Sequence, residues 1–308
     1  VFVVFSFTSV VDLIISLEED GYISGFMEVY VREGEPYVRT AHGIMTCYWD
    51  GIIHYGLYLA MIAAIGQGRS HRNLGLFWLG SLMMSVVVFL LGNLIGKYSS
   101  ELSPTFLLNV PYVLIPIWAG VRLFKQPKIR PCLSPEKVAE EQRKCLYQRP
   151  QDVGLVLLLL LNIAFTFFRG MVVLDCPADS CFEYTYQREP YLRDPVAYPK
   201  VQMLIYLFYV LPFFCLCLYG LVLPGCSWLP DWSLVFAGAV AQAQFSHVGS
   251  SLHSRTPFPY QTPDDVWWSF LIANGLYALG PQLLAARCLL CPAFFQPLTP
   301  ASLRKKRQ

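Results

Sequence analysis

The stretch NVPYVLIPIWAGVR (residues 109–122) has a counterpart, NGLYALGPQLLAAR, at residues 274–287. Both begin with Asn, and each continues with Tyr three residues later, Leu two later, Pro two later and Arg six later. The motif Glu-Pro-Tyr also occurs upstream of each copy, at residues 35–37 and 189–191. Matches at fixed spacing inside apolar segments indicate an internal repeat, so the sequence predicts two copies of one structural unit.

The composition is typical of a membrane protein. Hydrophobic residues make up 55% of the chain and charged residues 14%, and the mean hydropathy is +0.44. The net charge of +2 is too small to indicate a nucleic-acid partner. The chain starts at Val1 inside an apolar run, so we expect that an N-terminal portion is missing.

Apolar segments close to the roughly 20 residues that a membrane-spanning helix needs occur along the whole chain. They divide as four plus four, at residues 1–17, 44–65, 74–95 and 105–124, then 153–174, 201–223, 232–252 and 266–290. We therefore expect an all-α membrane protein of about eight transmembrane helices. The expected divisions are a first four-helix repeat (1–124), a basic linker (125–152), a second four-helix repeat (153–290) and a tail (291–308).

The distribution of charge predicts the orientation. Lys and Arg gather in residues 67–72, in the linker and in the tail, whereas acidic residues dominate 18–43 and 175–200. The positive-inside rule then places the linker and the C-terminus in the cytosol. An even number of spans in each copy gives both copies the same orientation.

The tail carries a second signal. Lys305 and Lys306 lie four and three residues from the end, the spacing of a dilysine retrieval signal of endoplasmic reticulum proteins. The alternative is an ordinary basic tail beside a membrane. On the opposite side, Cys176 and Cys181 could form a disulfide or remain free thiols.

Ionisable groups within the spans are candidates for function, because burying them in a membrane is costly. Asp50 and His54 are four residues apart and share a helix face, a plausible acid/base unit. Together with Asp12 they predict a polar pocket in the first repeat. Asn93, which weakly matches Gln244, is a further polar candidate. The alternative is that these groups satisfy one another as structural hydrogen bonds.

The remaining chemistry is sparse. Pro116 and Pro281 are expected to kink their helices, with Asn109 and Asn274 two turns earlier on the same side. His247 and His253 are expected near the mouth of the second repeat. The chain has no phosphate-binding Gly loop, no nucleophile elbow and no metal-ligand spacing. We expect neither a cofactor nor a metal.

These residues resemble a known family. The early acidic residue, the Glu-Pro loop and the Asn-x-x-aromatic-x-x-x-Pro helix resemble the EXPERA domain of emopamil-binding protein, a sterol isomerase, and of the sigma-2 receptor. Two tandem copies resemble the transmembrane 6 superfamily, as do CYWDG (residues 47–51) and PGCSWLP (residues 224–230). The resemblance implies a protein of the endoplasmic reticulum and the ER–Golgi intermediate compartment that affects triglyceride and cholesterol metabolism and triglyceride-rich lipoprotein secretion.

The resemblance also implies site residues. In the first repeat it implies a lipid- or sterol-binding site formed by Asp12, Asp50, His54, Asn93, Asn109, Tyr112 and Pro116. Tyr112 replaces a Trp of the isomerase, and Ser9 and Leu13 stand where the isomerase has His and Glu. The second-repeat counterpart would be Gln244, Asn274, Tyr277 and Pro281, with Arg169 near the first-helix position and no acid that matches Asp12.

Two hypotheses follow. The first is a non-enzymatic lipid-handling protein whose partners are a membrane lipid or sterol and lipoprotein-assembly proteins. The alternative is a Δ8–Δ7 sterol isomerase in which Asp12, Asp50 and His54 form a rearranged proton relay. A transporter is a third, more distant reading of the repeats. Separately, we expect Glu101 to stabilise the hairpin between the third and fourth spans, unless it is a solvated loop carboxylate.

Overall fold

The computed structural model describes residues 1–100, 104–129 and 133–297, and every regular element within these ranges is a helix. Glu101, Lys305 and Lys306 lie outside the described residues. The first half (residues 1–125) holds α1 (Phe2–Glu19), α2 (Glu28–Glu33), α3 (Ala41–Trp49), α4 (Tyr55–Gly66), α5 (Arg72–Ile95) and α6 (Val110–Lys125). After α7 (Pro135–Arg143), the second half (residues 150–297) holds α8 (Pro150–Val173), α9 (Asp179–Glu183), α10 (Tyr198–Ile205), α11 (Leu211–Val222), α12 (Leu229–Leu252) and α13 (Trp267–Leu290).

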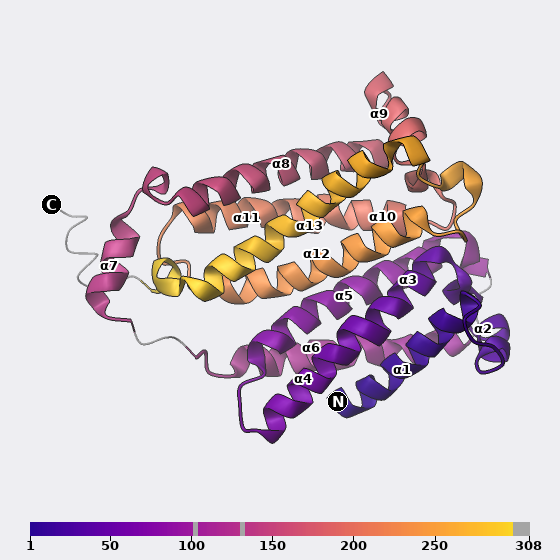
Figure 1. Cartoon of the computed structure of the whole chain (residues 1–308), viewed down its shortest axis with the longest axis horizontal. Coiled ribbons are helices and arrows are strands. Elements are labelled where there is room, and N and C mark those ends of the chain that lie inside the picture. The colour runs from indigo at the N-terminus through magenta and orange to yellow at the C-terminus, as the bar shows by residue number, and fades with distance from the viewer. Residues whose placement is uncertain (101–103, 130–132, 298–308) are drawn as a thin grey trace.

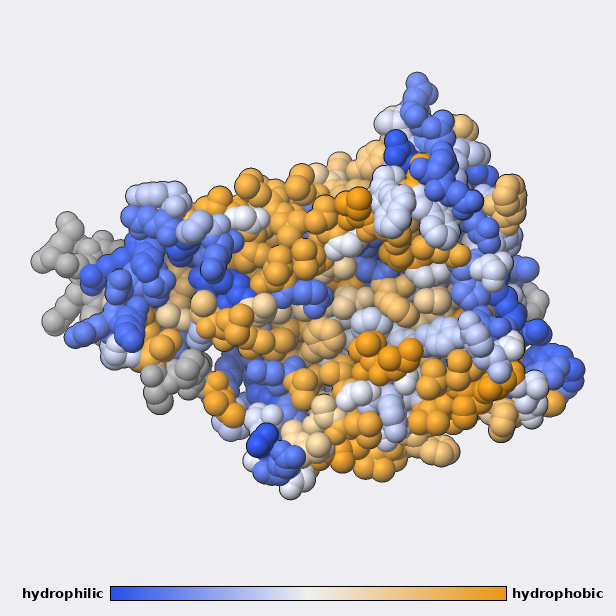
Figure 2. Space-filling view, viewed as in Figure 1, coloured by the Kyte–Doolittle hydropathy of each residue, from blue (hydrophilic) through white to orange (hydrophobic). Residues whose placement is uncertain are grey.

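The long helices run along the longest axis of the molecule, with the first half below the second in Figure 1. The short helix α7 lies at one end, whereas α2 and α9 lie at the other. Figure 2 shows a broad hydrophobic band over the middle of the molecule and hydrophilic residues at both ends. This surface is the one expected of a protein whose middle lies in lipid and whose ends lie in water.

Several helices are long and apolar enough to cross a membrane. In the described residues these are 5 segments, namely Arg72–Ile95, Phe106–Lys125, Pro150–Val173, Tyr198–Val222 and Phe258–Leu290. The other expected spans coincide with α1, with α3 and α4, and with α12, which carry more polar side chains, among them Asp12, Asp50 and Gln242. The all-helical membrane fold is thus confirmed.

The two halves share local features that are uncommon in helical proteins. A π-helical turn, Asp50–His54, joins α3 to α4, and another, Tyr206–Val210, joins α10 to α11. Such turns are rare and are frequently found at functional sites. Before each broken helix, a Glu precedes a short 3₁₀ turn: Glu35 before Pro36–Arg39 and Glu189 before Pro190–Arg193.

The halves meet where α5 crosses α12, the most extensive contact between two helices in the described structure. A Cβ atom on Gly80 would lie 1.8 Å from the carbonyl oxygen of Val235, and one on Gly238 would lie 2.0 Å from that of Phe77. Only glycine permits so close an approach of two helix backbones. The contact is reciprocal, because each helix packs one glycine against the backbone of the other.

An ion pair joins the same two helices at their N-terminal ends. Arg72 donates to Asp231 through Nη1 (2.6 Å) and Nη2 (3.0 Å), and its Nε donates to the carbonyl of Leu123. Lys128 also pairs with Asp231. Arg72 and Asp231 are both buried, so this bidentate pair fixes the register of the two halves at one end of the crossing.

Candidate functional site

A cavity of about 300 Å³ lies in the first half, between α1, α3, α5 and the start of α6. Of the seven residues expected to form the first-half site, four line this cavity, namely Asp12, Asp50, Asn109 and Tyr112. Further polar lining comes from Thr8, Tyr30, Glu35, Thr46 and Ser85, and apolar lining from Val11, Ile15, Leu82, Val86 and Phe89. A polar cluster beside an apolar wall suits an amphipathic small molecule.

Two carboxyl groups meet in the cavity wall. The side chain of Asp12, on α1, is in hydrogen-bonding contact with that of Asp50, at the start of the π-helical turn. Asp50 also accepts from the Ser9 hydroxyl at 2.6 Å. Because α1 packs against this turn, the acids of two different helices face one cavity.

A chain of hydrogen bonds leads from Asp50 into the protein. His54 Nδ1 bonds to Asp50 Oδ1 at 2.5 Å, and His54 Nε2 bonds to Ser81 Oγ at 2.7 Å. Trp49 Nε1 donates to Ser81 Oγ at 2.8 Å. This is the connectivity of an Asp-His-Ser triad, but Ser81 is fully buried and does not line the cavity. This series of hydrogen bonds therefore orients Asp50 and His54, and Ser81 is not accessible from the cavity.

Glu35 is a cavity residue that the sequence analysis did not select. Its carboxylate accepts from Tyr30 (3.0 Å), from Tyr37 (2.9 Å) and from Asn109 Nδ2 (3.3 Å). Burial, together with the adjacent Glu35 charge, raises the pKa of Tyr30 and of Tyr37, so both remain donors. The repeated Glu-Pro-Tyr motif was the available signal, because it fixes this Glu at the start of a turn in both halves.

Three of the expected first-half residues do not line the cavity. His54 lies behind Asp50, and Pro116 is buried in α6. Asn93 accepts a hydrogen bond from the Tyr198 hydroxyl in the second half.

The second half places an ion pair among the corresponding residues. Arg169, on α8, donates to Glu189 through Nε (3.0 Å) and through Nη2, and Nη2 also donates to Asn274 Oδ1 at 2.8 Å. Glu189 also accepts from Tyr184 (2.7 Å) and bonds to His247 Nε2 (2.6 Å). Burial raises the pKa of Glu189, but the positive Arg169 and the hydrogen bonds outweigh it and hold this pKa at about 2.

The other expected second-half residues belong to this buried network or lie beside it. Gln244 donates to Asn274 Oδ1 at 3.0 Å and accepts from Tyr206 at 2.9 Å. The Tyr277 hydroxyl bonds to Thr166 at 2.7 Å, and Pro281 is buried in α13. Arg169 and Glu189 thus neutralise one another where the first half exposes acids to a cavity.

Three smaller predictions can be placed. His247 is buried in the Arg169 network, whereas His253 Nε2 bonds to Asp20 at 3.1 Å at the end of the helices. Cys176 and Cys181 are free thiols in hydrogen-bonding contact. Among the described residues, no group of three or more His, Cys, Asp or Glu side chains is placed to hold a metal ion.

Comparison with known proteins gives a consistent family. Residues 1–134 match the family described as "Transmembrane 6 superfamily member 2-like, transmembrane domain", and residues 178–288 match "EXPERA (EXPanded EBP superfamily)". The chain is 62% identical to Transmembrane 6 superfamily member 2 of mouse (Mus musculus), of rat (Rattus norvegicus) and of human (Homo sapiens). Each match covers 100% of this chain and 82% of the relative. No solved structure shows significant similarity.

Proposed function

The chain belongs to the transmembrane 6 superfamily, and we propose that it is a lipid-handling membrane protein whose first-half cavity binds a sterol or another lipid. The observation that carries this proposal is the convergence of Asp12, Asp50, Glu35 and Asn109 on one cavity that also has an extensive apolar lining. Polar groups at one side would hydrogen bond to a lipid hydroxyl, while the apolar wall would pack against its hydrocarbon.

The contrast between the halves supports binding in the first half alone. In the second half, Arg169 already donates hydrogen bonds to the Glu189 carboxylate and to the Asn274 amide oxygen. Glu35 has only neutral donors, from Tyr30, Tyr37 and Asn109, as its hydrogen-bond partners among the described residues. The first half therefore retains polar groups that can bind a ligand, whereas in the second half the equivalent groups bind one another.

Equilibrium binding to the purified protein tests this proposal. A tritiated sterol and a tritiated phospholipid would each be titrated against wild-type protein, Asp12→Asn and Asn109→Ala. Saturable binding that either variant weakens supports the cavity as the site. Binding that is unsaturable, or equal in all three proteins, would overturn the proposal.

A sterol isomerase is the second candidate, and one observation favours it. The paired carboxyls of Asp12 and Asp50, linked to His54 and Ser81, form a continuous path for a proton that opens into the cavity. Purified protein would be incubated with a Δ8 sterol and the product double bond located by mass spectrometry. Turnover lost in His54→Ala would establish the enzyme, and binding without turnover would exclude it.

For the architecture, we propose the finer arrangement of eight spans in two tandem four-helix repeats. The matching π-helical turns and the matching Glu-initiated 3₁₀ turns support it. The spans that carry polar residues into the membrane would be helix α1, the broken helix α3–α4, and helix α12. Cysteine-accessibility labelling at both ends of α1 and of α12 would test whether these helices span the membrane. The two ends of a spanning helix must be labelled from opposite sides.

For the cellular role, we propose residence in the endoplasmic reticulum and the ER–Golgi intermediate compartment, with a cytosolic C-terminus and a part in lipoprotein secretion. The support is the dilysine spacing of Lys305 and Lys306 and membership of the family. Replacing both lysines with alanine should move the protein to later compartments. Unchanged distribution of this variant would argue against retrieval through the tail.

A further inference from the structure

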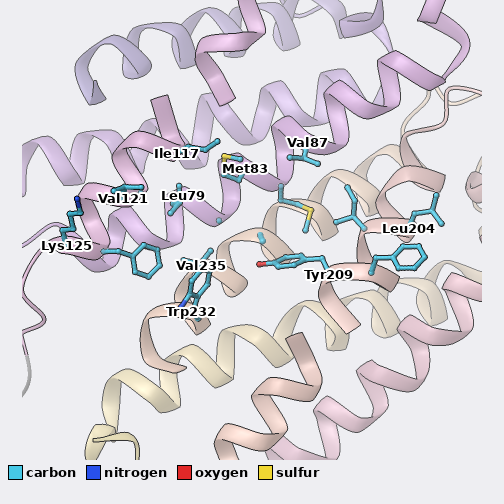
Figure 3. Close-up of a pocket in the computed structure, with 17 residues that line it drawn as sticks. Leu79, Met83, Val87, Ile117, Val121, Lys125, Leu204, Tyr209, Trp232 and Val235 are labelled. Carbon is cyan, nitrogen blue, oxygen red and sulfur yellow. The ribbon is translucent and has the colours of Figure 1, made fainter. Parts of the chain in front are cut away.

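A second and larger cavity, of about 900 Å³, forms a groove between the two halves. Figure 3 shows its lining side chains on both sides of the groove, with Lys125 at one end and Leu204 at the other. The α5–α12 crossing supplies Gly80 and Val235, α6 supplies Ile117 and Val121, and the second half supplies Leu204 and Tyr209. The groove is thus built jointly by both halves and is separate from the first-half cavity.

The groove opens between two helices that are apolar enough to cross a membrane. Ile117, in the span Phe106–Lys125, is 48% exposed, and Phe208, in the span Tyr198–Val222, is 72% exposed. Both line the groove. In a membrane, exposed apolar side chains at this depth face lipid chains. The groove therefore opens toward hydrocarbon rather than water.

Its charge is confined to one end. Lys125 is the one charged residue in the lining that the described part of the chain provides, and it is the last residue of α6 and of the Phe106–Lys125 span. Nearby Arg72 and Lys128 are paired with Asp231, whereas Lys125 makes no ion pair with any residue the structure describes. A lysine at the end of a span reaches the headgroup level of the bilayer.

The groove is elongated and apolar, and it ends in an unpaired cation at headgroup depth. It is therefore complementary to an anionic phospholipid, which has an apolar chain and a negatively charged headgroup. We propose that this groove binds one acyl chain of an anionic glycerophospholipid, with the net negative headgroup beside Lys125. Its volume lies within the range of about 300–1,000 Å³ typical of small-molecule sites. The site would hold a structural or transported lipid whatever the first-half cavity binds.

Photo-crosslinking tests the proposal on the whole protein in phosphatidylcholine nanodiscs. The probes are phosphatidylserine and phosphatidylcholine, each carrying a diazirine halfway along one acyl chain, added in separate samples. Labelled peptides are mapped by mass spectrometry. Val121→Trp fills the groove, and Leu114→Trp is its control, because Leu114 is also exposed on α6 but does not line the groove.

The charge arm uses Lys125→Glu, with Arg122→Glu as the control. Arg122 is exposed on the same helix, stacks on Trp118 and does not line the groove. General attraction of anionic lipid would be weakened equally by both variants, whereas a bound headgroup would respond to Lys125 alone. We expect Lys125→Glu to lower phosphatidylserine labelling roughly five-fold or more and to change phosphatidylcholine labelling far less, because the choline of that lipid offsets the charge of its phosphate.

The expected result is labelling of the α5, α6 and Tyr198–Val222 peptides that is lost in Val121→Trp and kept in Leu114→Trp. Equal labelling in these two variants would overturn the groove as the chain site. Equal labelling by the two probes, or equal effects of the two charge reversals, would overturn the anionic headgroup. If Val121→Trp does not fold, the surface variant Lys125→Glu still decides the proposal through the mapped groove peptides.

Discussion

Glu35 and Glu189 adopt the same backbone conformation, with φ −137° and ψ 65° at Glu35 and φ −141° and ψ 63° at Glu189, yet among the described residues only Glu189 faces an arginine. Each Glu begins a Pro-Tyr turn, and each accepts from a tyrosine hydroxyl that precedes it in the chain. The local structure is therefore shared, while the charge around it differs. This difference separates a cavity with free polar groups from a closed polar network.

Neutralising the two glutamates should have unequal effects on stability. Glu189→Gln leaves Arg169 as a buried charge without its partner, which costs about 3–5 kcal/mol. Glu35→Gln keeps a hydrogen-bond acceptor of the same shape, and no cation among the described residues pairs with Glu35, so we expect a loss below about 1 kcal/mol. Thermal unfolding of the detergent-solubilised variants measures both. Equal loss of stability would contradict the distinction drawn between the halves.

The glycine crossing of α5 and α12 should not tolerate a methyl group. Gly80→Ala or Gly238→Ala places Cβ against a backbone carbonyl that cannot rotate away, and overpacking of this kind costs about 1–3 kcal/mol. Gly275→Ala is the matched control, because nothing lies within 4 Å of its Cβ position on α13. We expect the control to unfold at the wild-type temperature or slightly above it. Wild-type stability in Gly80→Ala would mean that the helices are not in backbone contact.

The ion pair between Arg72 and Asp231 should matter more than a surface pair. Asp231→Asn leaves the buried Arg72 guanidinium without a counter-charge, and we expect a loss of about 3–5 kcal/mol. The Lys200–Asp175 pair is the control, because its side chains are 46% and 89% exposed, and Asp175→Asn should cost less than about 1 kcal/mol. Chemical denaturation followed by tryptophan fluorescence compares them. A similar loss of stability in both variants would show that the Arg72–Asp231 pair does not hold the two halves together.

The sequence was sufficient for the fold class and for part of the site. Polarity within the expected spans indicated Asp12 and Asp50, and the EXPERA resemblance implied Asn109 and Tyr112; the structure brings all four to one cavity. Asn93 was paired with Gln244 by a repeat register that counted identical or similar residues. In the structure Asn93 accepts a hydrogen bond from Tyr198, whereas Gln244 donates to Asn274 and accepts from Tyr206.

The remaining features depend on tertiary contacts. Glu35 lies in a loop by sequence, and only the packing of α1 against α2 and α3 brings it to the cavity. The Arg169–Glu189 pair joins residues on α8 and in the following loop, so neither residue alone predicted the other as its partner. The groove between the halves is formed by residues of four helical segments. Its apolar side chains cannot be told apart, from the sequence, from side chains that pack in the hydrophobic core.

The central claim is that the first-half cavity holds a lipid, and a photoreactive sterol tests it most directly. Ser85→Phe fills the cavity from α5, and Ala60→Phe, exposed on α4, adds the same ring outside it. We predict labelling of α1 and α3 peptides in the wild type and in Ala60→Phe, and its loss in Ser85→Phe. Labelling of those peptides that persists in Ser85→Phe would contradict the claim.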